Sequence, residues 1–176
     1  CGDMAEYGLG SVVTVNVSVF QLKVPNFSLR ITEILGRHGL APQKLAIEIT
    51  EGSDIFLEAQ AVRNVERLRK LGVQIWLDDF GTGFAGLTWL RRFKFDVVKI
   101  DRSFLHDCQT SHGLSLLRDM VGLLRNLGHV VLAEGVETEE QYILLQRLGV
   151  DLMQGFLTGH PVPIEEVNQI RQGLVA

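Results

Sequence analysis

The segment "QIWLDDFGTGFAG", Gln74–Gly86, is an apolar run that ends in two adjacent aspartates and continues into a glycine-rich stretch. The G-x-G-x-x-G spacing after a strand is typical of dinucleotide-binding turns, and Asp79-Phe80-Gly81 matches the metal-binding tripeptide of protein kinases. Two aspartates immediately before the turn would repel a bare pyrophosphate, and no H-R-D or V-A-I-K segment accompanies the tripeptide. We therefore interpret the segment as a metal-binding strand end followed by a flexible glycine loop.

Short β-branched runs alternate with longer amphipathic segments on both sides of this stretch, which is typical of βαβ units around a parallel sheet. Glycines stand where several of the helices should end, and Thr138 and Gln141 form a capping box. The predicted strands are Val12–Val17, Leu45–Thr50, Gln74–Asp79, Val97–Asp101, Val130–Glu134 and Asp151–Phe156. The predicted helices are Ser28–His38, Ile55–Leu71, Gly86–Phe93, Gly113–Leu127, Glu139–Leu148 and Ile164–Gln172.

Each predicted strand carries a polar residue near its carboxyl end, at the same relative height, although a fully covered parallel sheet should be apolar on both faces. Strand alternation places these residues on one face, as for Trp76 with Asp78 and Leu132 with Glu134. The fold class that fits is α/β, a TIM-like (β/α) barrel whose polar residues converge on the carboxyl-end mouth. A closed barrel has eight strands and about 250 residues. We therefore expect an incomplete barrel of about six βα units, lacking its first units and completed by a second copy.

The composition indicates one globular unit of 176 residues, of which 46% are apolar. The net charge of −4 comes from interspersed charges, so we expect no basic stripe and no polymeric nucleic acid partner. Two cysteines without metal-ligand spacing suit a reducing interior, and cytoplasmic is the expected location. No apolar run approaches the roughly 20 residues that span a bilayer, so this segment is expected to make no membrane contact.

Three carboxylates and one amide oxygen arrive from three successive strands at one end of the sheet: Asn16, Glu48, Asp78 and Asp79. Oxygen ligands of this kind suit Mg²⁺ or Mn²⁺, and close carboxylates would repel one another without a cation. Alternation points Asp78 inward, while Asp79 can turn over the rim, an arrangement suited to two ions and in-line displacement at phosphorus. The alternative is that the two aspartates only cap the turn that follows.

Lys99 lies on the inward face of an apolar strand, where its ammonium group needs carboxylates or a metal-bound water. It would orient the attacking water or neutralise charge on the phosphorane, and the alternative is a structural ion pair with a rim carboxylate such as Asp101. Glu134 is a candidate general base or ligand, and Glu137 follows three residues later; the alternative for both is a charged strand end that begins a solvated loop. Gln154 is a candidate for contact with a base edge or metal-bound water, or else a buried glutamine bonded to backbone.

Six motifs in register over essentially the whole chain resemble the EAL-type cyclic di-GMP phosphodiesterases. They are "NVS" at Asn16–Ser18, "EITE" at Glu48–Glu51, "DDFGTGF" at Asp78–Phe84, "VKIDRSF" at Val98–Phe104, "AEGVET" at Ala133–Thr138 and "QGFLTGHP" at Gln154–Pro161.

This resemblance implies that residues 1–176 are one partial EAL domain, which uses Mg²⁺ or Mn²⁺ to hydrolyse cyclic di-GMP to linear pGpG. It implies metal ligation by Asn16, Glu48, Asp78 and Asp79, positioning or activation of water by Lys99 and Glu134, and a site role for Gln154. Glu51 and the loop 80–87 resemble the family's loop anchor and mobile loop, which couple dimer contacts to the metal site. A homodimer and upstream regulatory domains are the implied partners.

Two departures from the family pattern stand out. The Glu-Ala-Leu tripeptide, with its metal-binding Glu, belongs to a strand that this sequence does not contain, so we expect the piece itself to be weakly active or inactive. Ala85 and Gly86 replace the usual serine pair, and Val19 and Phe20 follow "NVS" where a small residue and an arginine are frequent. The alternative function is a catalytically silent receptor of cyclic di-GMP, and a third is an unrelated barrel enzyme with a single metal.

Overall fold

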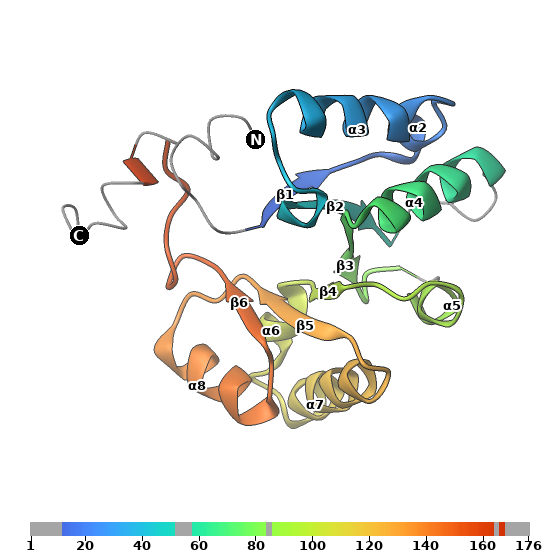
Figure 1. The fold of residues 1–176 in the computed structure, drawn as a ribbon. Helices are drawn as coiled ribbons and strands as arrows, with labels where there is room; N and C mark the ends of the chain where they lie inside the picture. The colour runs from blue at the N-terminus through green and yellow to red at the C-terminus, as the bar shows by residue number, and fades with distance from the viewer. Residues whose placement is uncertain (1–11, 52–57, 84–85, 164–165, 168–176) are drawn as a thin grey trace.

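The computed structural model describes residues 12–51, 58–83, 86–163 and 166–167. Six strands form one curved sheet in the order β1-β2-β3-β4-β5-β6, and every neighbouring pair is parallel (Figure 1). The strands are β1 (Val13–Asn16), β2 (Leu45–Thr50), β3 (Gln74–Phe80), β4 (Val97–Ile100), β5 (Val130–Glu134) and β6 (Leu152–Gln154). All six predicted strands are present, within a few residues of their predicted bounds.

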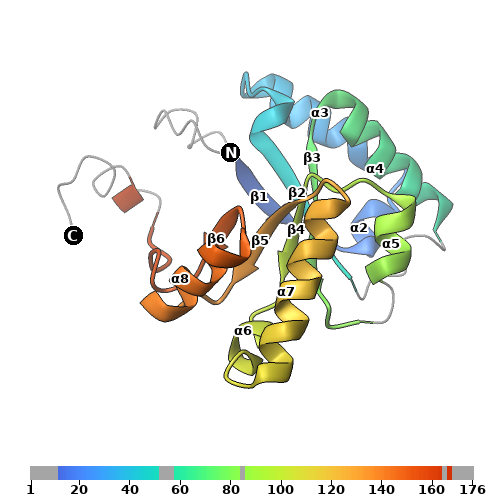
Figure 2. The same ribbon diagram turned by 90° about the horizontal axis from the view of Figure 1, so that it is seen from below.

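Helices connect the strands and lie around the outside of the curved sheet (Figures 1 and 2). They are α2 (Val19–Leu22), α3 (Phe27–Arg37), the 3₁₀ helix η1 (Pro42–Lys44), α4 (Ala59–Leu71), α5 (Gly86–Arg92), α6 (Ser103–Asp107), α7 (Ser111–Asn126) and α8 (Glu139–Leu148). The short elements α2, η1 and α6 were not predicted, because three to five residues carry too little periodicity to be recognised. The first residues predicted for α4, at 55–57, and most of the predicted helix 164–172 lie outside the described residues.

The two faces of the sheet are separated as the alternation predicts. The outward residues, such as Ile47, Ile75 and Val98, are buried under the helices in the large core. A second, small cluster lies on the inward face, where Ala46, Trp76, Val97 and Leu132 pack together. The polar residues that follow two positions later on the same strands therefore continue the inward face toward the carboxyl ends.

Helix ends are set by the predicted capping residues. Gly72 and Gly149 end α4 and α8 in the left-handed conformation, with φ of 96° and 79°, which costs glycine little because it has no Cβ. The hydroxyl of Thr138 caps α8 by accepting a hydrogen bond from the N–H of Gln141, and the N–H of Thr138 donates to the side-chain oxygen of Gln141. These caps fix where α8 leaves the mouth of the barrel.

A buried amide joins the first helices to α4. Asn64 has no exposed surface; its Nδ2 donates to the carbonyls of Leu22 and Val24, and its Oδ1 accepts from the hydroxyl of Ser28. The side chain thereby satisfies backbone groups at the end of α2 that no regular element pairs. Asn64 thus orders the turn that carries the chain from α2 into α3.

The sheet is open among the described residues, because β1 and β6 stand at its two edges and are not paired with each other. Six parallel strands with outer helices form part of a TIM-like barrel, which confirms the predicted fold class. Across the described part of the chain, no helix combines the length and apolar character that crossing a bilayer requires.

Candidate active site

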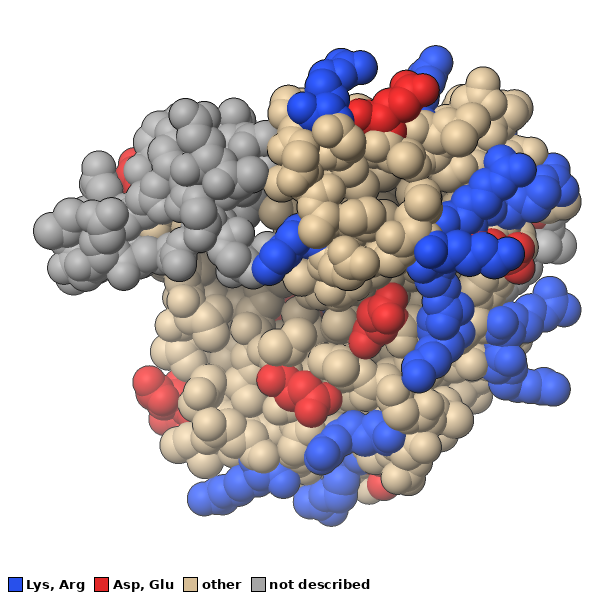
Figure 3. Space-filling view, in the orientation of Figure 1, with Lys and Arg blue, Asp and Glu red and all other residues tan. Residues whose placement is uncertain are grey.

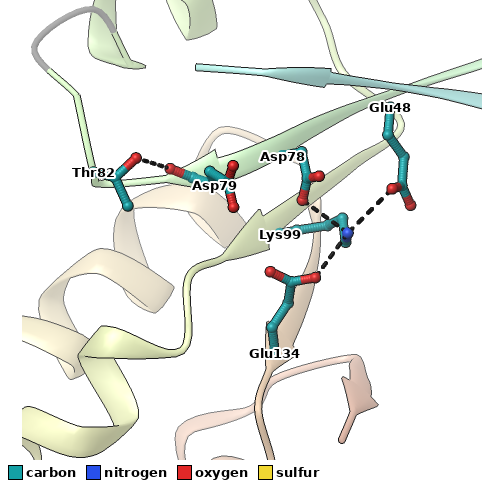
Figure 4. Close-up of polar contacts among 6 residues, drawn as sticks. All are labelled: Glu48, Asp78, Asp79, Thr82, Lys99 and Glu134. Carbon is teal, nitrogen blue, oxygen red and sulfur yellow. Dashed lines mark hydrogen bonds and ion pairs between the residues drawn. The ribbon is translucent and has the colours of Figure 1, made fainter. Parts of the chain in front are cut away.

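Lys99 is the centre of a buried ionic cluster at the carboxyl end of the sheet (Figure 4). Its side chain is 5% exposed, and its Nζ lies 2.7 Å from Asp78 Oδ1, 2.7 Å from Glu134 Oε1 and 3.2 Å from Glu48 Oε2. These residues come from β2, β3, β4 and β5, four adjacent strands. The cluster therefore joins side chains that are up to 86 positions apart in sequence, from Glu48 to Glu134.

Lys99 does form ion pairs with carboxylates, but Asp101, the partner suggested from the sequence, is not one of them. Asp101 does not form an ion pair with Lys99; its carboxylate instead accepts hydrogen bonds from the N–H and the hydroxyl of Ser103. This turn holds the end of β4 as the chain enters α6. The ammonium of Lys99 therefore pairs only with the inward carboxylates of Glu48, Asp78 and Glu134 among the described residues.

The strand register corrects the expectation of equal heights. Asn16 lies opposite Glu48, Asp78 lies opposite Thr50, and Glu134 lies opposite Gln154. Because Glu48 lies opposite Trp76, two residues before Asp78, the carboxylates occupy staggered rows rather than one row. Strand stagger is a property of barrels, and the long Lys99 side chain bridges these rows.

Asp78 and Asp79 act together because β3 is irregular at this point. The pairing with β4 shifts between Leu77 and Phe80, and Asp79 has a positive φ of 55°. Simple alternation would point Asp79 to the opposite face, and this irregularity instead turns it over the rim toward Asp78: oxygens of Asp78, Asp79 and Glu134 lie within 4.8 Å of one another. A bulge is a common device for turning a side chain into a site.

A turn fixes the strained residue Asp79. The hydroxyl and the N–H of Thr82 both donate to the backbone carbonyl of Asp79, at 2.8 and 3.2 Å (Figure 4). The hydrogen bonds of the turn thus use the carbonyl and leave the carboxylate of Asp79 for the cluster. Thr82 was not singled out from the sequence, although a threonine three residues after an aspartate is a familiar turn pattern.

Charge is unbalanced in this cluster, because four carboxylates face the one ammonium of Lys99. Burial raises the pKa of Asp79, and the charge of Asp78 raises it further. Burial also raises the pKa of Glu134, against the opposing hydrogen bond and charge of Lys99. For Lys99, burial alone would lower the pKa, but the short contacts with the carboxylates of Asp78 and Glu134 and the charges of these groups outweigh it, so the net shift is upward.

The donor set fits a hard divalent cation. The three clustered oxygens of Asp78, Asp79 and Glu134 are all carboxylate oxygens, the ligands that Mg²⁺ and Mn²⁺ prefer. Asp78 Oδ1 is buried and accepts no hydrogen bond of good geometry from the described residues, although it contacts Lys99 as an ion pair. Asp79 adds a carboxylate for which no ion pair is formed within the described part of the chain. A cation here would relieve the repulsion that raises the pKa of Asp79.

The remaining predicted site residues surround the cluster without joining it. Asn16 and Gln154 are exposed, and each lies beside a cluster carboxylate in the sheet register, Asn16 by Glu48 and Gln154 by Glu134. Glu137 is exposed, and its N–H donates to Gln141 at the start of α8. The structure therefore places Asn16 and Gln154 at the two flanks of the cluster and Glu137 in the loop outside it.

Glu51 is hydrogen-bonded to both ends of the glycine loop. Its side chain is buried, with Oε2 accepting from the N–H of Gly81 and Oε1 from the N–H of Gly86, both at 2.7 Å. The N–H of Glu51 also donates to the carbonyl of Asp78. A Cβ at Gly86 would lie 2.6 Å from the Phe80 ring and 3.0 Å from Glu51, so this close approach requires glycine. Glu51 thus links both ends of the loop to the aspartate pair.

A parallel (β/α) barrel with an acidic centre at the carboxyl ends of its strands is the architecture of TIM-barrel enzymes. Within this class the chain belongs to the EAL domain family, because residues 2–161 match the sequence profile described as "EAL domain".

The chain is similar to two curated relatives that are much longer. It is 41% identical over 167 residues to an uncharacterised signalling protein of Caulobacter vibrioides, covering 94% of this chain and 20% of that protein. It is 35% identical over 158 residues to the probable cyclic di-GMP phosphodiesterase PdeA of Escherichia coli, covering 89% and 22%. The chain thus spans about a fifth of the length of these relatives.

Solved structures share the fold. The EAL domain of Mycobacterium smegmatis DcpA superposes with a TM-score of 0.88 at 32% identity, covering 99% of this chain and 80% of that one. A cyclic di-GMP complex of the phosphodiesterase PaMucR gives 0.84 at 34% identity, covering 94% and 69%. A manganese and cyclic di-GMP complex of Klebsiella pneumoniae BlrP1 gives 0.81 at 32% identity, covering 89% and 41%.

Proposed function

We propose that this chain is the core of a phosphodiesterase domain that hydrolyses cyclic di-GMP to linear pGpG with Mg²⁺ or Mn²⁺. The observation that carries the proposal is the convergence of Asp78, Asp79 and Glu134 beside the buried Lys99. PdeA is named a probable cyclic di-GMP phosphodiesterase, and the phosphodiesterase PaMucR is solved in complex with cyclic di-GMP. Both similarities support cyclic di-GMP as the substrate of this chain. The manganese in the BlrP1 complex supports a divalent cofactor.

Asp78 and Asp79 are the central metal ligands in this proposal, with Asn16 and Glu48 on one flank. A bound divalent ion, or a pair of them, would neutralise charge on the phosphate and lower the pKa of a bound water. Glu48 would exchange part of its contact with Lys99 for the metal. The backbone of the bulge already orients both aspartates into the cluster.

Lys99 and Glu134 are the proposed catalytic pair. Lys99 remains protonated, so it can hold the attacking water or a phosphate oxygen and cannot serve as the base. Glu134, whose pKa is raised by burial, is the better acceptor for the proton that the water loses. The water oxygen then bonds to phosphorus as the bond from phosphorus to the 3′ oxygen breaks, and that oxygen takes a proton from solvent.

Three further residues have supporting roles in this proposal. Gln154, beside Glu134 in the sheet, and Glu137 in the next loop would contact the nucleotide. Glu51 would keep the loop in position over the aspartate pair through its two hydrogen bonds. Residues 1–176 would act as one unit in a cytoplasmic homodimer, with regulatory domains elsewhere in the longer protein.

The deciding experiment incubates the protein with cyclic di-GMP and either Mg²⁺ or Mn²⁺ and resolves the products by anion-exchange chromatography. We expect pGpG to accumulate with the longer protein that contains this chain, and chelation of the metal to stop it. The longer protein that contains this chain is assayed in parallel, because the 176-residue piece alone is expected to be weakly active or inactive. Binding of cyclic di-GMP by the longer protein without any turnover, with either ion, would instead establish a receptor.

A further inference from the structure

A hollow separate from the Lys99 cluster lies on the outside of the sheet, between α7 and α8. Its volume is about 480 Å³, and the described residues that line it include no carboxylate. They are three arginines, an asparagine, a glycine and a leucine: Arg118, Arg125, Arg147, Asn126, Gly122 and Leu148. The hollow belongs to the helical layer, whereas the Lys99 cluster lies on the inward face of the strands.

The sequence brings these side chains together by helical spacing. Arg118, Gly122, Arg125 and Asn126 follow one another at intervals of four, three and one along α7, which places them on one face of that helix. Arg147 stands in the last turn of α8 and faces them from the other side of the hollow. Lys and Arg side chains accordingly extend along the lower edge of the molecule in Figure 3, where α7 and α8 lie in Figure 1.

The three guanidinium groups have no carboxylate partner among the residues that the structure describes. Neither Arg118, Arg125 nor Arg147 forms an ion pair within 4.0 Å with any carboxylate in the described ranges. The carboxyl ends of α7 and α8 supply a negative potential of about half a charge each, which leaves a net charge of about +2. Convergent cations without counter-charges are stabilised when an anion binds between them.

Gly122 keeps the hollow open. It lies in the interior of helix α7, where glycine is less favourable than alanine. A Cβ at this position would meet nothing within 4 Å, so packing does not require glycine there. The missing side chain therefore leaves free volume between the arginines, at some cost to the helix.

We propose that this hollow binds a phosphate-bearing ligand of at least two negative charges, such as a diphosphate or a phosphomonoester. The planar guanidinium group pairs bidentately with phosphate oxygens, and the amide of Asn126 adds a neutral donor. A tetrahedral phosphate offers enough oxygens for three arginines, whereas one carboxylate has only two. The acidic Lys99 cluster repels the same anions, so binding here is independent of the proposed catalytic site.

The test uses metal-free protein, so that the acidic cluster cannot bind phosphate through an ion. Sodium pyrophosphate is titrated by isothermal calorimetry at constant ionic strength. We expect saturable binding that is at least tenfold weaker in the double variant Arg118→Gln, Arg147→Gln. We expect the same weakening in Gly122→Leu, which keeps every positive charge and removes only the volume.

The double variant Arg69→Gln, Lys70→Gln is the matched control, because it removes the same charge from exposed positions on α4. It should bind pyrophosphate like the unmodified protein. Equal weakening in this control, or full affinity in Gly122→Leu, would mean that only the overall charge matters and would overturn the proposal. Thermal unfolding of each variant shows whether it is folded, and a folded Gly122→Leu is expected to be at least as stable as the parent.

A sedimentation experiment with lipid vesicles distinguishes a lipid headgroup from a soluble ligand as the source of the phosphate group. Phosphatidylcholine vesicles with and without phosphatidic acid are sedimented with the protein. Binding that requires phosphatidic acid and is competed by pyrophosphate would identify a lipid headgroup, whereas pyrophosphate binding without sedimentation would identify a soluble ligand. If the protein neither binds pyrophosphate nor sediments with the vesicles, the proposed site is refuted.

Discussion

Lys99 and Glu134 stand on adjacent strands, and the Nζ of Lys99 lies 2.7 Å from Oε1 of Glu134. The same ammonium also contacts Asp78 and Glu48, so the chain itself supplies the first cation of its acidic centre. Buried carboxylates at this distance from one another would otherwise raise the free energy of the folded state. The acidic centre is thus already assembled by the protein, and a metal has only to add to it.

Asp78→Asn should remove cyclic di-GMP hydrolysis and weaken metal binding without unfolding the protein. Loss of a metal ligand withdraws several kcal/mol of transition-state stabilisation, which corresponds to about a hundredfold or more in rate. Removing one of the repelling carboxylates should leave the metal-free thermal midpoint unchanged or higher. Turnover, metal affinity by calorimetry and thermal unfolding are the measurements.

Asp119→Asn is the matched control for this change, because Asp119 is an exposed residue of α7. It removes the same charge with the same loss of volume but should retain activity. Full activity in Asp78→Asn would show that the aspartate pair has been assigned to the wrong role.

Lys99→Met should destabilise the fold strongly. It leaves the carboxylates of Glu48, Asp78 and Glu134 buried without their common cation, a loss that costs about 3–5 kcal/mol for comparable buried pairs. Urea unfolding measures the change, and added Mg²⁺ should recover more stability in the variant than in the parent. The exposed Lys94→Met is the control and should shift stability by no more than about 0.5 kcal/mol. A small effect at Lys99 would show that the cluster does not depend on the ammonium.

Glu51→Gln should loosen the glycine loop. A glutamine keeps one acceptor oxygen, so either Gly81 or Gly86 loses its partner, at a cost of about 1–3 kcal/mol. Misplacement of the loop should slow hydrolysis by about ten- to a hundredfold while metal affinity is retained. The exposed Glu66→Gln on α4 is the comparison. Unchanged turnover in Glu51→Gln would separate the loop from catalysis.

Asn64→Ala should lower stability by about 2–4 kcal/mol, because it leaves the Leu22 carbonyl and the Ser28 hydroxyl unpaired in a buried place and removes one of the two hydrogen bonds to the Val24 carbonyl. Denaturant unfolding is the measurement, and Gln60→Ala, on the same helix but less buried, is the control. Equal effects of the two substitutions would contradict the role given to Asn64. The metal affinity of any folded fraction should be normal, because Asn64 lies in the outer layer.

Asp101 should contribute to the loss of folding stability at low pH. Burial would raise its pKa, but the hydrogen bonds from Ser103 outweigh this, and the pKa is lowered on folding. A carboxyl group with a lowered pKa stabilises the fold above its unfolded pKa of about 3.9, and this contribution is lost as the pH falls through the folded value. Urea unfolding between about pH 5 and about pH 2.5 should therefore show a shallower loss of stability in Asp101→Asn. Ser103→Ala should also make stability depend less steeply on pH. If the parent, Asp101→Asn and Ser103→Ala all lose stability with the same slope, Asp101 does not contribute to the acid sensitivity of the fold.

The sequence by itself determined the six strands, the face that each inward residue occupies and most of the acidic set. These follow from local periodicity and from residue types that are costly to bury alone, as with Lys99 and Asp78. It also gave the capping box of α8, because a cap depends only on residues within one turn.

Only the tertiary structure decided how these residues meet. The bulge that turns Asp79 beside Asp78 depends on the register between β3 and β4, and the partners of Lys99 depend on the stagger of four strands. The arginine hollow likewise requires α7 and α8 to pack side by side, since Arg118 and Arg147 are far apart in sequence. Local pattern fixes the direction of a side chain within its own element, whereas distances between elements are set by packing and strand register.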